Sequence, residues 1–261
     1  MARRLTILCS VLMLAAIVGQ PDCALAQQTR SVQGRHFPLN QYTPPGVAAE
    51  WATNAGHATP GWFQPVKVSL PSTGQVTFFD GHPSRPVTQP APAQAALLVG
   101  RMYRFCVSDL PEFPGQEFWP SLELIDQLHP PVGQIDRFPM TFELTEEELD
   151  MAVNGRLVTK VIYLEQPDRV PLANLESGPR ILDIGPSQNP LAEADLLGRP
   201  VAILRIGGRT PDPQHPDPQF FGPGFPVRLR VDSPAPTPAA TTQRISQPAP
   251  ALTAIKQHTV R

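Results

Sequence analysis

Residues 142–165 have the sequence FELTEEELDMAVNGRLVTKVIYLE, and the patterns at the two ends of this stretch decide the fold class. Apolar residues occupy every second position over 138–144, which is the period of a strand with one buried face. The run at 157–164 is apolar on both faces except at Thr159 and Lys160, which is typical of a central strand. The stretch therefore predicts two strands, and the residues between them follow neither pattern.

Those intervening residues predict a short helix over 146–154. Thr145 and Glu148 have the spacing of a capping box, in which the hydroxyl accepts from the third helical amide and the carboxylate reaches back to the cap. A second short helix is predicted over 190–197, because Asn189 is a favourable N-cap and a proline follows it at the first helical position.

Further strand-type runs flank this stretch. Residues 71–74 have the composition of a hairpin turn between the first two of them. About seven or eight short strands with frequent turn residues predict an all-β protein with two short helices, arranged as an immunoglobulin-like β-sandwich. The runs lie at 66–70, 75–79, 95–107, 118–125, 180–184 and 201–206.

The composition agrees with a folded β-rich protein. The chain has 261 residues, of which 41% are hydrophobic, and its 34 prolines argue against a mostly helical fold. A formal net charge of −2 gives no electrostatic basis for binding nucleic acid. The basic residues are nearly all arginine, with lysine only at positions 67, 160 and 256, and we attribute this preference to genome composition.

Residues 1–26 have the three parts of a secretory signal peptide. A basic start precedes an apolar run at 5–19, and an A-x-A pattern ends at Ala26. The apolar run is short for a membrane span, so we expect cleavage before Gln27 and no membrane span afterwards. Twin-arginine export and lipid attachment at Cys23 are weaker alternatives, because the flanking residues fit neither pattern. The expected location is the periplasm, cell envelope or exterior of a bacterium.

The mature chain divides into three parts by composition. Residues 27–59 predict an irregular lead-in, and residues 60–208 contain the strand patterns of the β-sandwich domain. Residues 209–261 are proline-rich and predict a mostly disordered tail. Within that tail, the apolar stretch at 225–231 either adds one edge strand or docks loosely.

Candidate catalytic and metal-binding residues all have structural explanations. Cys106 is the one cysteine left after signal cleavage, and its place within a strand predicts a buried, unreactive thiol. The glutamates at 146–148 are explained by helix capping. Six histidines occur without metal-ligand spacing, so we predict no catalytic, cofactor-binding or metal-binding residues. The histidines are His36, His57, His82, His129, His215 and His258.

Four aromatic residues form a further candidate. Trp62, Phe63, Phe118 and Trp119 would suit an aromatic binding face. Because β-sandwiches bury such side chains routinely, we predict that they belong to the core.

Three blocks of sequence resemble a recurrent family of uncharacterised exported bacterial proteins. The blocks are 61–79, 142–165 and 197–212, and the resemblance covers about residues 60–212. It implies a β-rich exported domain but no activity, cofactor or catalytic residue.

These observations predict an exported, non-catalytic β-sandwich module that binds or scaffolds a partner in the cell envelope. Its expected partner is an envelope protein or a polysaccharide. Two alternatives stay open. The first is an accessory module that recognises carbohydrate or peptide along a sheet face or edge, and the second is a small hydrolase with a site assembled from scattered residues.

Overall fold

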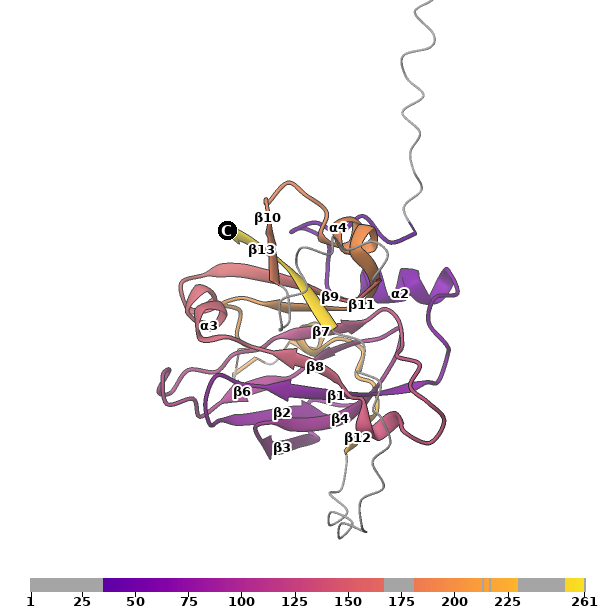
Figure 1. Ribbon diagram of the computed structural model, residues 1–261. Helices are drawn as coiled ribbons and strands as arrows, with labels where there is room; N and C mark the ends of the chain where they lie inside the picture. The colour runs from indigo at the N-terminus through magenta and orange to yellow at the C-terminus, as the bar shows by residue number, and fades with distance from the viewer. Residues whose placement is uncertain (1–34, 167–180, 213, 216, 230–251, 261) are drawn as a thin grey trace, which may run out of the picture. The chain divides into compact units, whose positions relative to one another are not determined.

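Strands dominate the residues that the computed structural model describes, which confirms the prediction of a mostly β protein (Figure 1). The described residues are 35–166, 181–212, 214–215, 217–229 and 252–260. Those from His36 onward form one unit by their mutual contacts. Their strands form three sheets.

The first sheet has four strands in the order β12-β4-β1-β8. Strand β1 pairs antiparallel with β4 and parallel with β8, and β12 pairs antiparallel with the other side of β4. The strands are β1 (Phe63–Ser69), β4 (Ala93–Leu98), β8 (Met140–Glu143) and β12 (Val227–Leu229).

The second sheet has six strands in the order β10-β13-β9-β11-β7-β5. All its pairings are antiparallel except β10 with β13. The strands are β5 (Met102–Arg104), β7 (Ser121–Leu124), β9 (Arg156–Glu165), β10 (Ile181–Ile184), β11 (Gly198–Ile206) and β13 (Leu252–Val260). The prediction of a central strand at 157–164 is confirmed, because β9 lies between β11 and β13.

The third sheet has the order β3-β2-β6, with β2 (Gln75–Phe79) between β3 (Pro86–Pro90) and β6 (Cys106–Ser108). The predicted hairpin at 71–74 is therefore wrong, because β1 and β2 belong to different sheets. Longer-range partners determine which strands pair. The single run expected at 95–107 is likewise divided among β4, β5 and β6.

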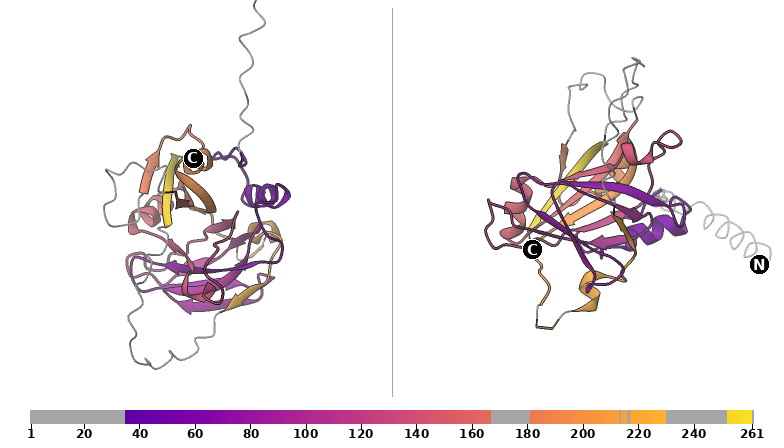
Figure 2. Two further views of the ribbon diagram at one scale, coloured as in Figure 1. Left: turned by 45° about the vertical axis from the view of Figure 1, so that its right-hand side comes forward. Right: turned by 90° about the horizontal axis from the view of Figure 1, so that it is seen from below.

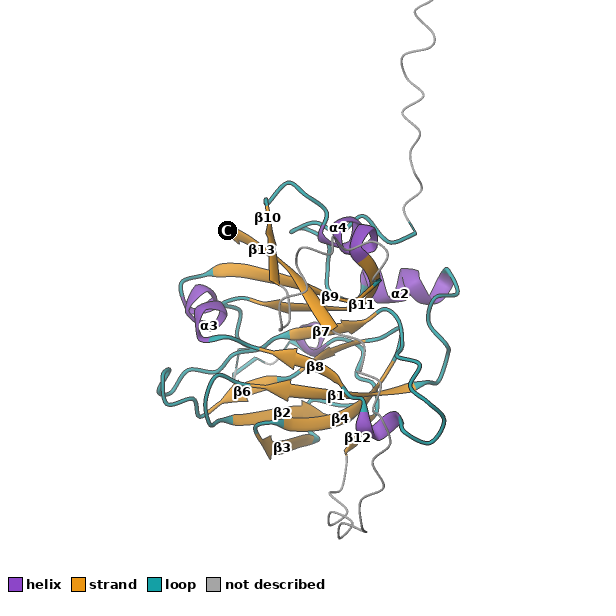
Figure 3. Cartoon of the chain, viewed as in Figure 1, coloured by secondary structure: helices purple, strands orange, loops and turns teal. Residues whose placement is uncertain are grey.

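One main core lies among the three sheets. It contains residues of β1, β4 and β8, residues of β7, β9 and β11, and Val76 and Phe78 of β2. In Figure 2 the strands of the smaller sheets gather on one side and those of the six-stranded sheet on the other. A second core joins β9, β11 and β13 to α2 (Val47–Asn54) and α4 (Pro190–Leu197). Figure 3 shows both helices next to that sheet.

Both helices predicted from sequence are present. The N-terminal cap of α3 (Glu146–Val153) is a capping box: Thr145 Oγ1 accepts from Glu148 N at 3.3 Å, and Thr145 N donates to Glu148 Oε2 at 3.1 Å. Helix α4 begins at Pro190, and its N-cap residue Asn189 accepts a hydrogen bond at Oδ1 from Leu191 N at 3.1 Å. The remaining short helices are η1 (Ile135–Arg137) and α5 (Pro218–Phe221).

The structure expected for two segments, the lead-in and the tail, needs correction. The lead-in is not irregular throughout, since α2 forms within it and packs on the six-stranded sheet. The tail is not mostly disordered among its described residues, since β12 is an edge strand and β13 lies inside the six-stranded sheet. The composition does not reveal β13 because its buried positions include the polar residues Thr253, Lys256 and Gln257. The side chains of Lys256 and Gln257 have partners on other segments.

A cluster of charges, buried except for that of Glu147, fixes α3 to the sheet. We call Lys160, Lys256, Glu147 and Glu148 the lysine cluster. Lys160 Nζ lies 2.8 Å from Glu148 Oε1 and donates to the Glu143 carbonyl at 2.7 Å. Lys256 Nζ lies 3.5 Å from Glu147 and 3.9 Å from Glu148. Because Lys160 and Lys256 are directly opposite in the β9–β13 register, this cluster ties α3 to both strands.

The predicted signal peptide at 1–26 lies outside the described residues. Among the helices that are described, none has the length and apolar character needed to cross a membrane.

Candidate functional site

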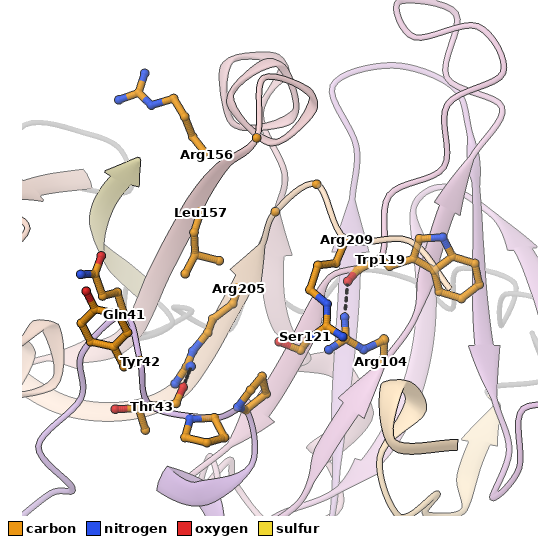
Figure 4. A pocket seen from close by; sticks show the side chains of 15 residues that line it. Gln41, Tyr42, Thr43, Arg104, Trp119, Ser121, Arg156, Leu157, Arg205 and Arg209 are labelled. Carbon is orange, nitrogen blue, oxygen red and sulfur yellow. Dashed lines mark hydrogen bonds between the residues drawn. The ribbon is translucent and has the colours of Figure 1, made fainter. Parts of the chain in front are cut away.

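A cavity of about 370 Å³ opens where the lead-in meets the six-stranded sheet (Figure 4). Residues before α2 form one wall, and the ends of β5, β7, β9 and β11 form the others. The lining residues are Gln41, Tyr42, Thr43, Pro44, Pro45, Arg104, Trp119, Ser121, Gly155, Arg156, Leu157, Arg205, Gly207, Gly208 and Arg209.

The lining carries cationic side chains without anionic ones. Four of the lining residues are arginines, from β5, β9, β11 and the segment after β11, and no lining residue is Asp or Glu. A surplus of positive charge in a partly desolvated cavity attracts anions, since low local polarisability strengthens electrostatic attraction. The four arginines are Arg104, Arg156, Arg205 and Arg209.

The charge of Arg205 is already balanced within the protein. Its guanidinium lies 3.3 Å from Glu123 Oε1, and both side chains are buried, at 5% and 1% exposure. It also donates to the backbone carbonyl of Thr43. Glu123 accepts from Ala49 N, in the first turn of α2, at 3.3 Å. Burial raises the pKa of Glu123, whereas Arg205 and the amides at the start of α2 favour its charged form.

This ion pair also positions one wall of the pocket. Glu123 belongs to β7 and Arg205 to β11, while their partners Ala49 and Thr43 belong to α2 and the lead-in. The pair therefore fixes residues 41–45 against the sheet.

Arg104 is held in place by its backbone and aromatic contacts. Its Nη1 donates to the Trp119 carbonyl at 3.0 Å, and its guanidinium carbon lies 4.2 Å from the centre of the Phe220 ring. Its Nε is buried and has no hydrogen-bond partner among the described residues. Burial, and then the positive charge of Arg209, lower the pKa of Arg104 to about 10, so the side chain remains charged at neutral pH.

Arg209 and Ser121 complete this side of the pocket. The guanidinium of Arg209 is close enough to Arg104 to repel it, and Figure 4 shows the two groups beside Ser121. Ser121 is buried at 3% exposure, and its hydroxyl has no hydrogen bond to any other described residue. Arg209 has no ion pair in the described part of the chain. Two like charges and a hydroxyl therefore face the same space without an anion.

Arg156 lies at the edge of the lining, and its side chain extends away from Arg104, Arg209 and Ser121 (Figure 4). It is the first residue of β9 and follows Gly155, whose φ of 74° ends the α3 turn in the left-handed region. Its buried Nε has no hydrogen-bond partner among the described residues. Nearby, a Cβ on Gly208 would lie 3.0 Å from the Ala152 carbonyl, so glycine allows the segment after β11 to approach α3 closely.

Of the residues singled out from sequence as site candidates, Trp119 alone lines this pocket. Cys106 is buried, as predicted, and burial raises the pKa of its thiol to about 12, helped by the charges of Glu117 and Asp109. Such a thiol is almost entirely protonated at neutral pH and is a poor nucleophile. Across the described ranges, no group of three or more His, Cys, Asp or Glu side chains is arranged to hold a metal ion.

The aromatic residues divide between the core and the pocket. Phe118 belongs to the main core, as predicted, while Trp62 and Phe63 are only half-buried. Trp119 is buried against Cys106 and Phe220 and also lines the pocket. The interpretation of all four as core residues therefore holds for Phe118 and in part for Trp119.

Sequence reasoning missed the arginines because they are scattered. Arg104, Arg156 and Arg209 come from three different elements, and no local motif joins them. The preference for arginine over lysine is visible in the sequence, but it does not show which arginines lie together. Only the pairing of strands brings these side chains to one cavity.

No protein-family model matches the chain, and no curated protein or solved structure matches it either. The resemblance to exported bacterial proteins therefore stays a prediction, and the function is argued from the pocket itself.

Proposed function

We propose that the protein is an exported, non-catalytic binding module of the cell envelope and that it binds an anionic ligand in the arginine-lined pocket. The observation that carries this proposal is the pair Arg104 and Arg209, whose like charges face one cavity beside Ser121. An oxyanion, such as a carboxylate or phosphate, relieves that repulsion and accepts hydrogen bonds from both guanidinium groups.

The size and polarity of the pocket support a small-molecule ligand. A volume of about 370 Å³ lies within the usual range for such sites. Its lining combines hydrogen-bond donors with apolar surface from Pro44, Pro45 and Leu157. No His, Cys, Asp or Glu is among the described lining residues, and this composition favours binding over turnover.

A sandwich architecture is part of the same proposal. The main core is shared by residues of the four-stranded and six-stranded sheets, as in a β-sandwich. The parallel pairs β1–β8 and β10–β13 differ from the antiparallel order of immunoglobulin domains. We therefore propose a sandwich in which these two sheets pack face to face. The two parallel pairs do not support an immunoglobulin-like strand order.

A second candidate is recognition of an acidic carbohydrate. Tyr42 lines the pocket, yet its side chain is 83% exposed. An exposed aromatic ring beside cationic donors suits a sugar ring that carries a carboxylate or phosphate.

Isothermal titration tests the proposal with inorganic phosphate, sulfate and acetate as probes. We expect binding of at least one of them that weakens as salt is added, because salt screens charge. Arg104→Met and Arg209→Met should each weaken binding about 10-fold or more, since hydrogen bonds to charged groups are worth roughly 1.5–3 kcal/mol.

Arg228→Met is the matched control. Arg228 is exposed on β12 and stacks on Phe63, away from the lining of this pocket. Its loss should leave anion affinity unchanged. The proposal is wrong if none of the three anions binds, or if Arg104→Met and Arg209→Met bind them as tightly as the unchanged protein.

A further inference from the structure

Two cations of the pocket lie close to the same aromatic ring. The guanidinium carbon of Arg104 lies 4.2 Å from the centre of the Phe220 ring, and that of Arg209 lies 5.8 Å from it. Arg104 extends from β5 and Arg209 from the segment after β11, and Figure 4 shows their guanidinium groups beside Ser121. We call Arg104, Arg209 and Ser121 the arginine-pair site.

No carboxylate of the described residues compensates the two charges of this site. Arg104 and Arg209 make no ion pair within the part of the chain that the structure describes. The charge of Arg205, in contrast, is balanced by Glu123 at 3.3 Å. The arginine-pair site therefore has two positive charges for an anion to neutralise.

Ser121 adds an uncharged donor to the site. Its side chain lines the cavity although the residue is only 3% exposed, and its hydroxyl has no hydrogen bond to another described residue. Buried polar groups normally have a hydrogen-bond partner, so a hydroxyl without one in a cavity wall is available to a ligand. The site thus combines three donor groups, of which two are charged.

We infer that the ligand is a small phosphate monoester whose terminal oxygens accept hydrogen bonds from Arg104, Arg209 and Ser121. This inference rests on the proposed function, because it concerns the same pocket. A phosphate monoester has three terminal oxygens and a charge of about −1.5 to −2 at neutral pH. A carboxylate has two oxygens and a single charge, and a sulfate ester has three oxygens but a single charge. The monoester therefore matches both the donor groups and the charge.

The rest of the cavity has room for the organic part of such an ester. Its volume of about 370 Å³ is in the range of sites that hold whole small molecules. The lining also includes the apolar side chains of Pro44, Pro45 and Leu157, on which an uncharged group packs. A free phosphate ion leaves this surface in contact with water, so an ester is the better match.

Isothermal titration with matched probes tests the inference. Phenyl phosphate, phenyl sulfate and benzoate have the same aromatic ring, and inorganic phosphate has none. At about pH 8, phenyl phosphate should bind about 10-fold or more tightly than phenyl sulfate, because its additional charge lies next to two cations. Benzoate and inorganic phosphate should also bind less tightly than phenyl phosphate.

The preference for the phosphate ester should depend on pH. A phosphate monoester loses its second proton with a pKa of about 6, so the preference should be complete at about pH 8 and lost by about pH 5. Burial, and then the charge of Arg209, lower the pKa of Arg104 only to about 10, so Arg104 stays charged throughout. The lining residues that titrate, other than arginine, are limited to Tyr42. Phenyl sulfate keeps its charge, so any titration in the protein, including that of Glu123 beside Arg205, acts on both esters and is separated from that of the ligand.

Two variants assign the preference to the arginine-pair site. Arg209→Met should remove most of the preference for phenyl phosphate over phenyl sulfate, because one of the two charges is lost. Ser121→Ala should weaken both esters by a similar factor, because the hydroxyl is uncharged. Arg228→Met, away from this pocket, should change neither. Circular dichroism checks that the variants are folded, and the two esters in the unchanged protein test the inference even if a variant fails to fold.

The outcomes distinguish the inference from the proposal on which it rests. If none of the esters, benzoate, acetate or the inorganic anions binds, the proposed function fails. If phenyl sulfate or benzoate binds as tightly as phenyl phosphate at about pH 8, the proposed function stands and the phosphate monoester is wrong. If inorganic phosphate binds as tightly as phenyl phosphate, the site takes the free ion, and the inference of an ester is overturned.

Discussion

The lysine cluster and the arginine-lined pocket are two groups of partly buried charge on the same six-stranded sheet. They differ in whether their cations have carboxylate partners. In the lysine cluster, Lys160 and Lys256 each lie within 4 Å of a glutamate, and Lys160 also donates to a backbone carbonyl. In the pocket, Arg104 and Arg209 face each other's charge and have no carboxylate partner in the described part of the chain.

The difference supports a structural role for the lysine cluster and is the basis of the binding role proposed for the pocket. A buried cation normally has a counter-charge, because desolvation of an unpaired charge is costly. The lysine cluster meets this requirement with its own residues, so it holds α3, β9 and β13 together. In the pocket, Arg205 has such a partner in Glu123, whereas Arg104 and the exposed Arg209 have no carboxylate partner among the described residues. Four experiments test this comparison.

Removing β13 should have the largest effect. A chain that stops before Leu252 loses the strand between β9 and β10, the buried side chain of Ile255 and the Lys256 part of the lysine cluster. We expect this chain to lose its cooperative thermal transition, measured by circular dichroism.

A synthetic peptide with the sequence 252–261 provides the control for the truncation. If β13 is needed for the sheet, adding the peptide should restore a transition to the truncated chain. The comparison breaks down if the truncated chain melts at the same temperature as the full chain.

Glu148→Gln should have the next largest effect. The substitution leaves Lys160 buried without its anion, and breaking a buried pair in this way costs about 3–5 kcal/mol. Urea denaturation measures the loss. Glu146→Gln is the matched control, since Glu146 is exposed in the same helical turn and should change stability by less than about 1 kcal/mol.

A double variant sharpens this result. In Glu148→Gln combined with Lys160→Met, no unpaired Lys160 charge remains, so part of the lost stability should return. Equal losses for Glu148→Gln and Glu146→Gln would show that the lysine cluster does not stabilise the fold.

Thr145→Ala should have a smaller effect, because it removes the capping box but not the ion pairs. We expect a loss of about 0.5–2 kcal/mol in urea denaturation. Thr145→Ser keeps the hydroxyl and should stay close to the unchanged protein. If the two variants have the same free energy of unfolding, the capping bond does not stabilise α3.

Arg209→Met should have the smallest effect on stability, and its sign should be opposite. Removing a charge that repels Arg104 should leave the free energy of unfolding within about 0.5 kcal/mol or raise it, as for other exposed positions. The gain should decrease when salt is added. A loss of more than about 1 kcal/mol, absent from Arg228→Met, would place Arg209 among the residues that hold the fold.

Local patterns explain what the sequence predicts correctly. The capping box at Thr145 and the N-cap at Asn189 depend on neighbours within a few residues, and both helices are present. Strand β9 is recognisable because both of its faces are buried in the middle of the strand, so residues 157–164 are apolar except at Thr159 and Lys160. In these elements the local preference and the tertiary structure agree.

Long-range pairing explains what the sequence does not predict. Strand β13 carries polar residues at buried positions, and these become favourable only beside partners such as Glu147 and Gly185. The pocket has the same origin, because its arginines are distant in sequence. The sequence does not show whether a lysine or arginine has a carboxylate partner. That depends on where the fold places the carboxylates.

The position of β13 has a consequence for the order of assembly. Residues 252–260 leave the ribosome after every other described strand, yet they lie between β9 and β10. The six-stranded sheet therefore cannot close before residues 252–260 are synthesised, and until then one edge of β9 is open. Pairing over such sequence distances is intrinsically slow, and an open edge invites aggregation. A chaperone that shields β9 should therefore be most useful just before translation of this region ends.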